Sequence, residues 1–369
     1  MNTKLSRNEK IYSILFILFF ILIAISYFYS QNKDEALRKL ILKLPILLTP
    51  LALLSFKNLQ EKSHQLIVGI LNYALFFPAF VSVYNYLLNK KLYDSLILES
   101  KPLSIEFGYG IYHIQFSIIL AITIIFGVFS LYHFFKQKNF NNLFWIVLFL
   151  VFFNCIFIHI LSARTGLLAL YIGLTVFILQ LFKNTPIKHK IRLSILSICL
   201  PILIIFVSSS LQNRIINTFE DIKVVWYNAN ANDYSFAMRV KAWKNSVDVI
   251  QNNIIFGVGI GDAEAVLFQN FEKVDASILP QNRRNPHLQF LESWVQSGIL
   301  SAILFLLILV YSVFKFKLQK NWLLLSISLL LLIASCFESI LERQASVVAF
   351  SFFLAFANFY PKKNANDKH

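Results

Sequence analysis

The sequence predicts an all-α integral membrane protein with roughly ten transmembrane helices and one large, partly helical loop outside the cytoplasm. Three observations predict this fold. Of the 369 residues, 57% are hydrophobic and only 14% are charged, whereas soluble domains average about 45–50% and about 25%. The apolar residues form long blocks with few charges, as a bilayer requires. The basic residues gather in the connections expected on one side of the membrane.

Several apolar blocks approach the length of a membrane span, which is about 20 residues. The first follows a basic start and offers no A-x-A cleavage site, so we expect an uncleaved anchor rather than a signal peptide. The second is the weakest, because it contains Lys43, Pro45 and Pro50. The expected spans are 11–29, 41–56, 66–88, 111–135, 142–161, 166–182, 191–208, 290–314, 322–336 and 346–360.

The distribution of charge predicts the topology. If the N-terminus is cytoplasmic, the connections on that side carry 17 Lys and Arg residues against three acidic ones, and the outward connections are balanced. This bias follows the positive-inside rule and places both termini in the cytoplasm. It accounts for the net charge of +15 through anionic membrane lipids, without nucleic acid as a partner. The loops 162–165, 209–289 and 337–345 then face outward.

Composition and spacing disfavour several functional classes. Cys155, Cys199 and Cys336 lie in apolar stretches, without metal-ligand or disulfide spacing. The sequence contains no H-x-x-x-H motif, and no Ser/His/Asp set that spacing alone would support. We see no internal repeat of the kind that would support a secondary transporter. No metal site is therefore expected.

The loop 209–289 is long for a compact membrane protein, and such loops are usually either functional or disordered. It contains an amphipathic stretch, Phe236–Asn252, in which Val240, Trp243, Val247 and Ile250 recur at helical spacing. We expect a helix there, which lies on the membrane surface or packs over the bundle.

A glycine cluster follows this stretch, with Gly257, Gly259 and Gly261 before Asp262. A dinucleotide fingerprint needs a preceding strand and a βαβ unit, and neither is expected here. A tight turn that brings the backbone close to a partner is the better interpretation.

His287 stands directly before an expected span, in Asn285-Pro286-His287. Pro286 suits the first turn of that helix. Histidine can take up a proton near neutral pH, although a histidine that caps a helix or anchors at the interface is the alternative. Arg283 and Arg284 add positive charge beside it.

Three arginines are expected on the same outward side, namely Arg164, Arg239 and Arg343. Arginine stays charged and binds phosphate oxygens bidentately; the alternative for each is an interfacial arginine that snorkels. Glu338 and Glu342 flank the last outward turn. They can pair with the arginines, assist a base, or form a helix-end salt bridge.

In this order, the residues resemble the O-antigen ligase/polymerase superfamily of membrane glycosyltransferases, over about 110–350. His287 and Gly298 have the spacing of the family's histidine motif, from which Leu288 and Ser301 depart. His113, at the start of the fourth span, also stands in a familiar place. The matching pieces are Ser162-Ala-Arg164-Thr165-Gly166, Met238-Arg239-Val-Lys-Ala-Trp243, Gly257-Val-Gly259-Ile-Gly261, Asn285-Pro-His287 with Glu292, and Glu338-Ser-Ile-Leu-Glu342-Arg343-Gln344.

The resemblance implies a multi-pass protein of the bacterial inner membrane, with transmembrane helices in 1–110 and an O-antigen ligase-like domain in 111–369. That domain includes the periplasmic loop 209–289. Such enzymes move a glycan from undecaprenyl pyrophosphate to an acceptor hydroxyl on the periplasmic face, and they need neither nucleotide sugar, metal nor other cofactor. The expected partners are the lipid-linked glycan donor, membrane lipids, and an acceptor that is lipid A–core or a glycan.

The resemblance also implies roles for the residues. His287, Arg239 and Arg164 are the expected catalytic residues, with His287 as the base and the arginines on the pyrophosphate. The expected substrate-binding residues are Arg343, Arg284, Glu342, Glu338 and His113. An O-antigen ligase is the first expectation, and a repeat-unit polymerase is the alternative. A lipid-linked glycan flippase or other transporter is the second alternative, which the outward clustering of charges disfavours.

Overall fold

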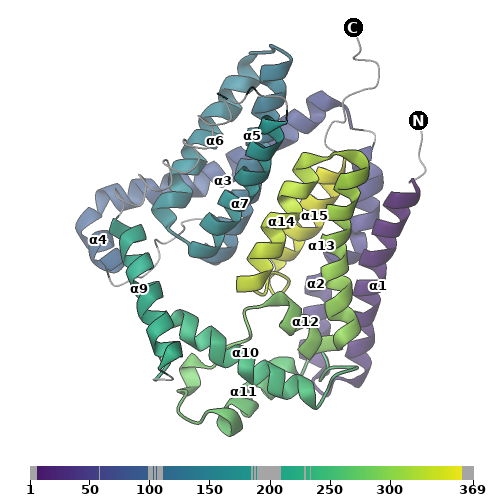
Figure 1. Ribbon diagram of the computed structural model, residues 1–369, viewed down its shortest axis with the longest axis vertical. Coiled ribbons are helices and arrows are strands. Elements are labelled where there is room, and N and C mark those ends of the chain that lie inside the picture. The colour runs from purple at the N-terminus through teal and green to yellow at the C-terminus, as the bar shows by residue number, and fades with distance from the viewer. Residues whose placement is uncertain are drawn as a thin grey trace. The chain divides into compact units, whose positions relative to one another are not determined.

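The computed structural model describes residues 6–57, 59–98, 103, 105, 111–183, 186, 188, 209–227, 230–232 and 234–359. Within these residues the secondary structure is helical and contains no strand (Figure 1). The prediction of an all-α protein is confirmed for the part of the chain that the structure describes.

The helices follow the apolar blocks of the sequence closely. Those before the large loop are α1 (Arg7–Tyr29), α2 (Lys33–Lys57), α3 (Glu61–Leu88), α4 (Lys90–Leu98), α5 (His113–Lys136), α6 (Asn142–Leu161) and α7 (Arg164–Phe182). From the start of the large loop onward, the helices are α9 (Ser209–Trp226), α10 (Ser235–Gln251), α11 (Ala263–Val274), the 3₁₀ turn η1 (Pro280–Asn282), α12 (Gln289–Ser297), α13 (Ile299–Gln319), α14 (Trp322–Phe337) and α15 (Gln344–Asn358).

Seven described helices are long and apolar enough to cross a membrane: α1, α2, α3, α5, α6, α7 and the Ile299–Phe316 part of α13. The apolar helices α14 and α15 are shorter than a full span. The expected span 191–208 lies outside the described residues. The chain is therefore a multi-pass membrane protein, and the figure of roughly ten spans stays a prediction.

The chain divides into two compact units, each assembled from distant parts of the sequence. Unit 1 comprises Met1–Ser55, Ile216–Phe314 and Leu331–Ala355, and unit 2 comprises Phe56–Ile215, Lys315–Leu330 and Phe356–His369. The expected division of the sequence near residue 110 stays a prediction.

In unit 2, α5 is the central helix. It packs against α3, α6 and α7, and most of its side chains are buried, whereas its neighbours each keep an exposed apolar face. Amide side chains tie the packed helices together, because Asn72 donates to the Thr123 carbonyl and Asn154 donates to the Asn72 carbonyl. Such bonds satisfy polar groups that have no water available.

In unit 1, the prediction of one continuous helix over 290–314 is wrong. The structure has two helices there, α12 and α13, which are separated by a break at Gly298. Gly298 has φ +84°, and a Cβ there would lie 1.8 Å from the Ile255 carbonyl oxygen. The Ile299 amide instead donates to the Ile254 carbonyl. The helix also begins at Gln289 rather than at Pro286, so α12 forms a short amphipathic helix before the span.

The glycine cluster forms a tight turn against unit 1 itself, as the sequence predicts. Gly257 and Gly259 have positive φ, which glycine adopts without strain. A Cβ at Gly259 would lie 2.6 Å from the Ser30 hydroxyl. The Asp262 carboxylate accepts the Gln31 and Asn32 amides, so the turn docks on the connection between α1 and α2.

The amphipathic helix is confirmed as α10, but its buried face differs from the expected stripe. Val247 is exposed. The side chains that α10 buries are Ala237, Met238, Ala242, Asn245, Ser246, Val249 and Ile250. Two of these are polar and can be buried because they are hydrogen-bonded. Asn245 donates to the Leu267 carbonyl, and Ser246 donates to the Ala242 carbonyl. Hydrophobic spacing alone misses such positions.

Candidate active site

His287 lies in the short segment between η1 and α12. Its φ of +48° is in the left-handed region, which is uncommon for a residue other than glycine and costs about 1 kcal/mol or more. The indole nitrogen of Trp243, on α10, donates to the Pro286 carbonyl at 2.7 Å. This bond ties the segment to α10 and fixes the place of His287.

Glu338 lies in the turn between α14 and α15. Its amide donates to the Ala334 carbonyl, and the Ile340 amide donates back to the Glu338 carbonyl at 3.0 Å. The turn therefore holds the Glu338 side chain inside unit 1, where only 4% of it is exposed.

Glu338 contacts both of the strongest sequence candidates. An Arg239 Nη donates to one of its carboxylate oxygens at 2.9 Å. The other oxygen lies 3.2 Å from Nδ1 of His287. Three segments of unit 1, namely α10, the segment before α12 and the α14–α15 turn, thus bring their polar groups to one place.

The three side chains differ in their access to solvent. Glu338 is 4% exposed, Arg239 is 15% exposed and His287 is 29% exposed. A buried carboxylate is stable only if it is paired and hydrogen-bonded. Arg239 and His287 supply these contacts, and His287 remains the member that a substrate can reach most easily.

The geometry also favours one tautomer of His287. If Nδ1 carries the proton and donates to Glu338, Nε2 has the lone pair and can accept a proton. Glu338 thereby orients the imidazole and stabilises its positive charge once a proton arrives. This is an arrangement suited to general-base chemistry.

A second buried network lies in the same unit, and of its members only Glu342 was predicted as a site residue. Lys43, on α2, is 2% exposed, and its ammonium donates to Glu342 Oε1 and to Gln296 Oε1, both at 2.6 Å. The Gln296 amide donates to Glu292, whose other oxygen accepts from Ser339. The network connects α2, α12 and the α14–α15 turn.

The backbone of the α14–α15 turn is held from α12 as well. The Leu341 amide donates to Gln289 Oε1 at 2.7 Å. The two glutamates of this turn have different partners: Glu342 contacts Lys43, and Glu338 contacts Arg239. The sequence signal for this network was Lys43, a charge inside the weakest expected span, where an ionisable residue is expensive and usually paired.

Two of the other arginines considered from the sequence lie openly in unit 1. Arg284 and Arg343 are exposed. Arg283 turns toward α11 instead, where it forms an ion pair with Glu272 at 2.8 Å and lies over the Phe268 ring.

Arg164 and His113 belong to unit 2. His113 is the first residue of α5 and Arg164 is the first residue of α7. The two helix starts pack closely, because a Cβ at Gly166 would lie 2.2 Å from the Ser117 hydroxyl. The structure thus places Arg164 and His113 at the same end of unit 2.

Among the described residues, no group of three His, Cys, Asp or Glu side chains is arranged to hold a metal ion. His287 and Glu338 come with an arginine as their third member.

Comparison with known proteins finds similarity over the central part of the chain. A protein of Haemophilus influenzae, described as uncharacterized, is 28% identical over 215 residues, which is 57% of this chain and 52% of that protein. The chain thus spans about half the length of this curated relative. Residues 148–306 match the family model described as O-antigen ligase. This segment contains Arg164, Arg239 and His287, so the resemblance predicted from the sequence motifs is confirmed, and over residues 148–306 the chain is similar to the O-antigen ligase family.

Proposed function

We propose that this protein is an O-antigen ligase, which moves a glycan from undecaprenyl pyrophosphate to a hydroxyl of lipid A–core on the periplasmic face of the inner membrane. The observation that carries the proposal is Glu338, a buried carboxylate that contacts both His287 and Arg239. His287 and Arg239 lie in the segment that is similar to the O-antigen ligase family.

His287 is the proposed base. Its Nε2 takes the proton of the acceptor hydroxyl as that oxygen attacks the anomeric carbon, and Glu338 stabilises the imidazolium that results. The new bond joins the acceptor oxygen to the anomeric carbon, and the bond from that carbon to the pyrophosphate oxygen breaks. A direct displacement of this kind inverts the anomeric configuration, and a product with retained configuration would contradict it.

Arg239 is the proposed partner of the leaving group. Pyrophosphate gains negative charge as the glycosidic bond breaks, and a fixed guanidinium beside it lowers the barrier without a metal. Glu338 holds Arg239 in place before the donor binds, through the bond at 2.9 Å. A donor phosphate can then share the guanidinium, because arginine has five N–H donors in a planar fork.

Arg164 is proposed as a second catalytic cation, and its position in α7 supports the proposal. A helix N-terminus attracts anions and disfavours cations by about 0.3–1 kcal/mol. Arg164 is the first residue of α7, so a phosphate bound there would be favoured by both the helix dipole and the guanidinium. His113, Arg284, Arg343 and Glu342 are proposed as substrate-binding residues, and the ligase-like domain is proposed to cover 111–369.

A complementation experiment tests the proposal in a strain that lacks its own surface-glycan ligase. Wild type, His287→Asn and Arg239→Ala are compared at matched membrane levels, and the readout is glycan on lipid A–core. Asparagine tolerates the left-handed backbone of position 287 better than alanine does. A loss of glycan transfer in His287→Asn therefore reports chemistry rather than folding. Lys273→Ala is the matched control, because Lys273 is an exposed cation of the same loop.

The proposal predicts transfer by wild type and Lys273→Ala, and none by the other two variants. Lengthening of the lipid-linked glycan without transfer to lipid A–core would assign a polymerase instead. If a well-expressed wild type causes neither change, a flippase or other transporter becomes the better hypothesis.

A further inference from the structure

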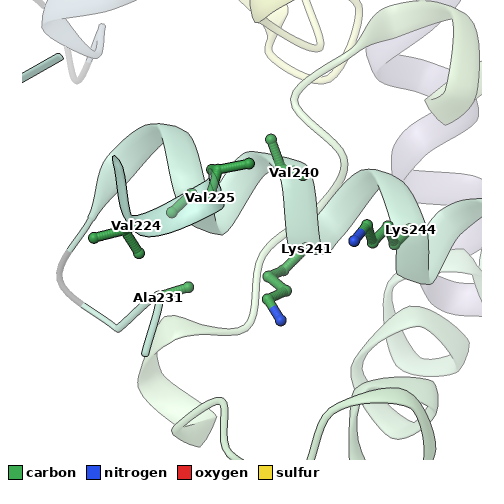
Figure 2. Close-up of a pocket in the computed structure, with 7 residues that line it drawn as sticks. Val224, Val225, Ala231, Val240, Lys241 and Lys244 are labelled. Atoms are coloured by element: carbon green, nitrogen blue, oxygen red, sulfur yellow. The ribbon is translucent and has the colours of Figure 1, made fainter. Parts of the chain in front are cut away.

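Helix α9 turns one face toward the protein, and this face carries Val224, Val225 and the buried Asp221. Val224 and Val225 pack against a cluster of buried side chains from α10, α11 and their connections. The members of this cluster are Ala231, Ala237, Met238, Ala242, Phe271 and Ile278. Figure 2 shows the two valines beside α10, around a shallow hollow that Ala231 and Val240 also line.

A second apolar face of α9 is turned away from this cluster. Phe219 is 62% exposed, Ile222 is 45% exposed and Trp226 is 83% exposed. At 100° per residue, these three side chains project from one sector of about 60°. The neighbouring Tyr227 is 77% exposed.

Charged residues lie on the flank of this exposed stripe. Glu220 and Lys223 form an ion pair at 2.8 Å, with about half or more of each side chain exposed. A helix with one apolar stripe, a charged flank and an aromatic end has the composition of helices that lie in the interface of a bilayer. Trp and Tyr favour that layer, because their rings are apolar and their N–H or O–H groups are polar.

Other observations favour lipid as the occupant of the stripe. The described part of the chain has seven candidate membrane spans, so a bilayer surface is part of its environment. Lys244, an exposed cation of α10, lines the hollow beside α9 (Figure 2) and adds positive charge that suits anionic headgroups. Lys241 lines the same hollow but is paired with Asp275 at 2.8 Å.

We propose that α9 lies in the interfacial layer of the bilayer, with Phe219, Ile222 and Trp226 against the acyl chains. Because α9 packs on α10, it also sets the depth of Arg239, the neighbour of the buried Met238. Arg239 is thereby held at the level where the pyrophosphate of a lipid-linked donor meets water. This last step rests on the proposed function, whereas the membrane contact of α9 does not.

Spin labels measure the membrane contact directly. Single cysteines at Phe219, Ile222 and Trp226 are compared with single cysteines at Glu220 and Lys223, in a chain whose three natural cysteines are replaced by serine. The labelled protein is placed in vesicles of phosphatidylethanolamine and phosphatidylglycerol. The proposal predicts that collisions with oxygen exceed those with a water-soluble nickel complex at the first three positions, and that the order reverses at the other two.

Water-like collisions at all five positions would overturn the proposal. Dipolar broadening between labels at Phe219 or Trp226 would also overturn it, since it would assign the stripe to a second copy of this chain.

A second measurement separates this inference from the proposed function. Phe219→Glu with Trp226→Glu should weaken the lipid contact and lower transfer at limiting donor, whereas Glu220→Gln should leave transfer unchanged. If wild type transfers no glycan but the spin labels show lipid contact, the proposed function fails and α9 remains interfacial. If transfer is normal in the double glutamate variant, the depth argument for Arg239 is wrong.

Discussion

Replacing Lys43 with methionine should destabilise unit 1 strongly, although methionine fills nearly the same volume. Lys43 is 2% exposed, and its ammonium lies 2.6 Å from both Glu342 and Gln296. Removing one partner of a buried ion pair costs about 3–5 kcal/mol, because the remaining charge is left uncompensated. Since the Glu342 side chain keeps 14% exposure, we expect the lower end, about 3 kcal/mol.

A double-mutant cycle isolates this pair from the general effect of substitution. The free energy of unfolding is measured in mixed micelles for Lys43→Met, Glu342→Gln and the double variant. Each single change leaves one charge buried without its partner, so the double variant should recover much of the loss, with a coupling of about 2 kcal/mol. Wild-type stability in Lys43→Met, or losses that simply add in the double variant, would refute the reasoning.

Four further outcomes follow from the contacts of unit 1. Gly298→Ala should cost on the order of 3 kcal/mol in unfolding free energy, because its Cβ would meet the Ile255 carbonyl at positive φ. Gly69→Ala is the mild control, because its Cβ would lie 3.3 Å from the Leu143 side chain. Equal losses of stability in the two variants would contradict this reasoning. Trp243→Phe should remove the bond to the Pro286 carbonyl, cost about 1 kcal/mol and reduce transfer; unchanged transfer would show that the bond does not position His287. His287→Ala should be less stable than His287→Asn by about 1 kcal/mol, because asparagine tolerates left-handed backbone, and the reverse order in thermal unfolding would contradict this. Burial opposes ionisation of Asp275, but Lys241 and Ser277 outweigh it and lower the pKa of that carboxyl. The ionised Asp275 therefore stabilises the fold at neutral pH, and this stabilisation is lost as pH falls through the folded-state pKa. If Asp275→Asn and wild type still differ in unfolding free energy in acid, the ion pair is not the cause.

The apolar helices were predictable because a bilayer leaves the sequence little choice. The helices α1, α3 and α6 lie where long uncharged blocks predict them. The glycine turn at Gly257 and Gly259 was predictable from its residues alone.

The break between α12 and α13 was not predictable from periodicity. The expected span ran through Gly298 because apolar residues recur on both sides of it, and the break arises because the Ile255 carbonyl approaches it from a distant part of the loop. The exposed Val247 has a similar cause, since α10 buries Asn245 and Ser246 on its packed face. Spacing identifies an amphipathic helix but does not show where buried polar groups find partners.

His287, Arg239 and Glu338 were all identified from the sequence, but pairing of Glu338 with an arginine or with the base was only one of the alternatives, beside a helix-end salt bridge. Arg239 and Glu338 are 99 residues apart, and Lys43 and Glu342 are 299 apart. Local pattern carries no information on pairs at such separations. Only the fold shows that Glu338 contacts both His287 and Arg239, whereas Glu342 is held by a lysine.

The central claim is that His287, oriented by Glu338, acts as the base when a glycan passes from a lipid pyrophosphate to an acceptor hydroxyl. Its most direct test uses purified protein in vesicles with an undecaprenyl-pyrophosphate-linked glycan and lipid A–core, without nucleotide sugar. The account predicts that wild type releases undecaprenyl pyrophosphate and glycosylated lipid in equal amounts, and that a folded His287→Asn variant releases neither. Undiminished transfer by His287→Asn, or none by a folded wild type, would contradict it.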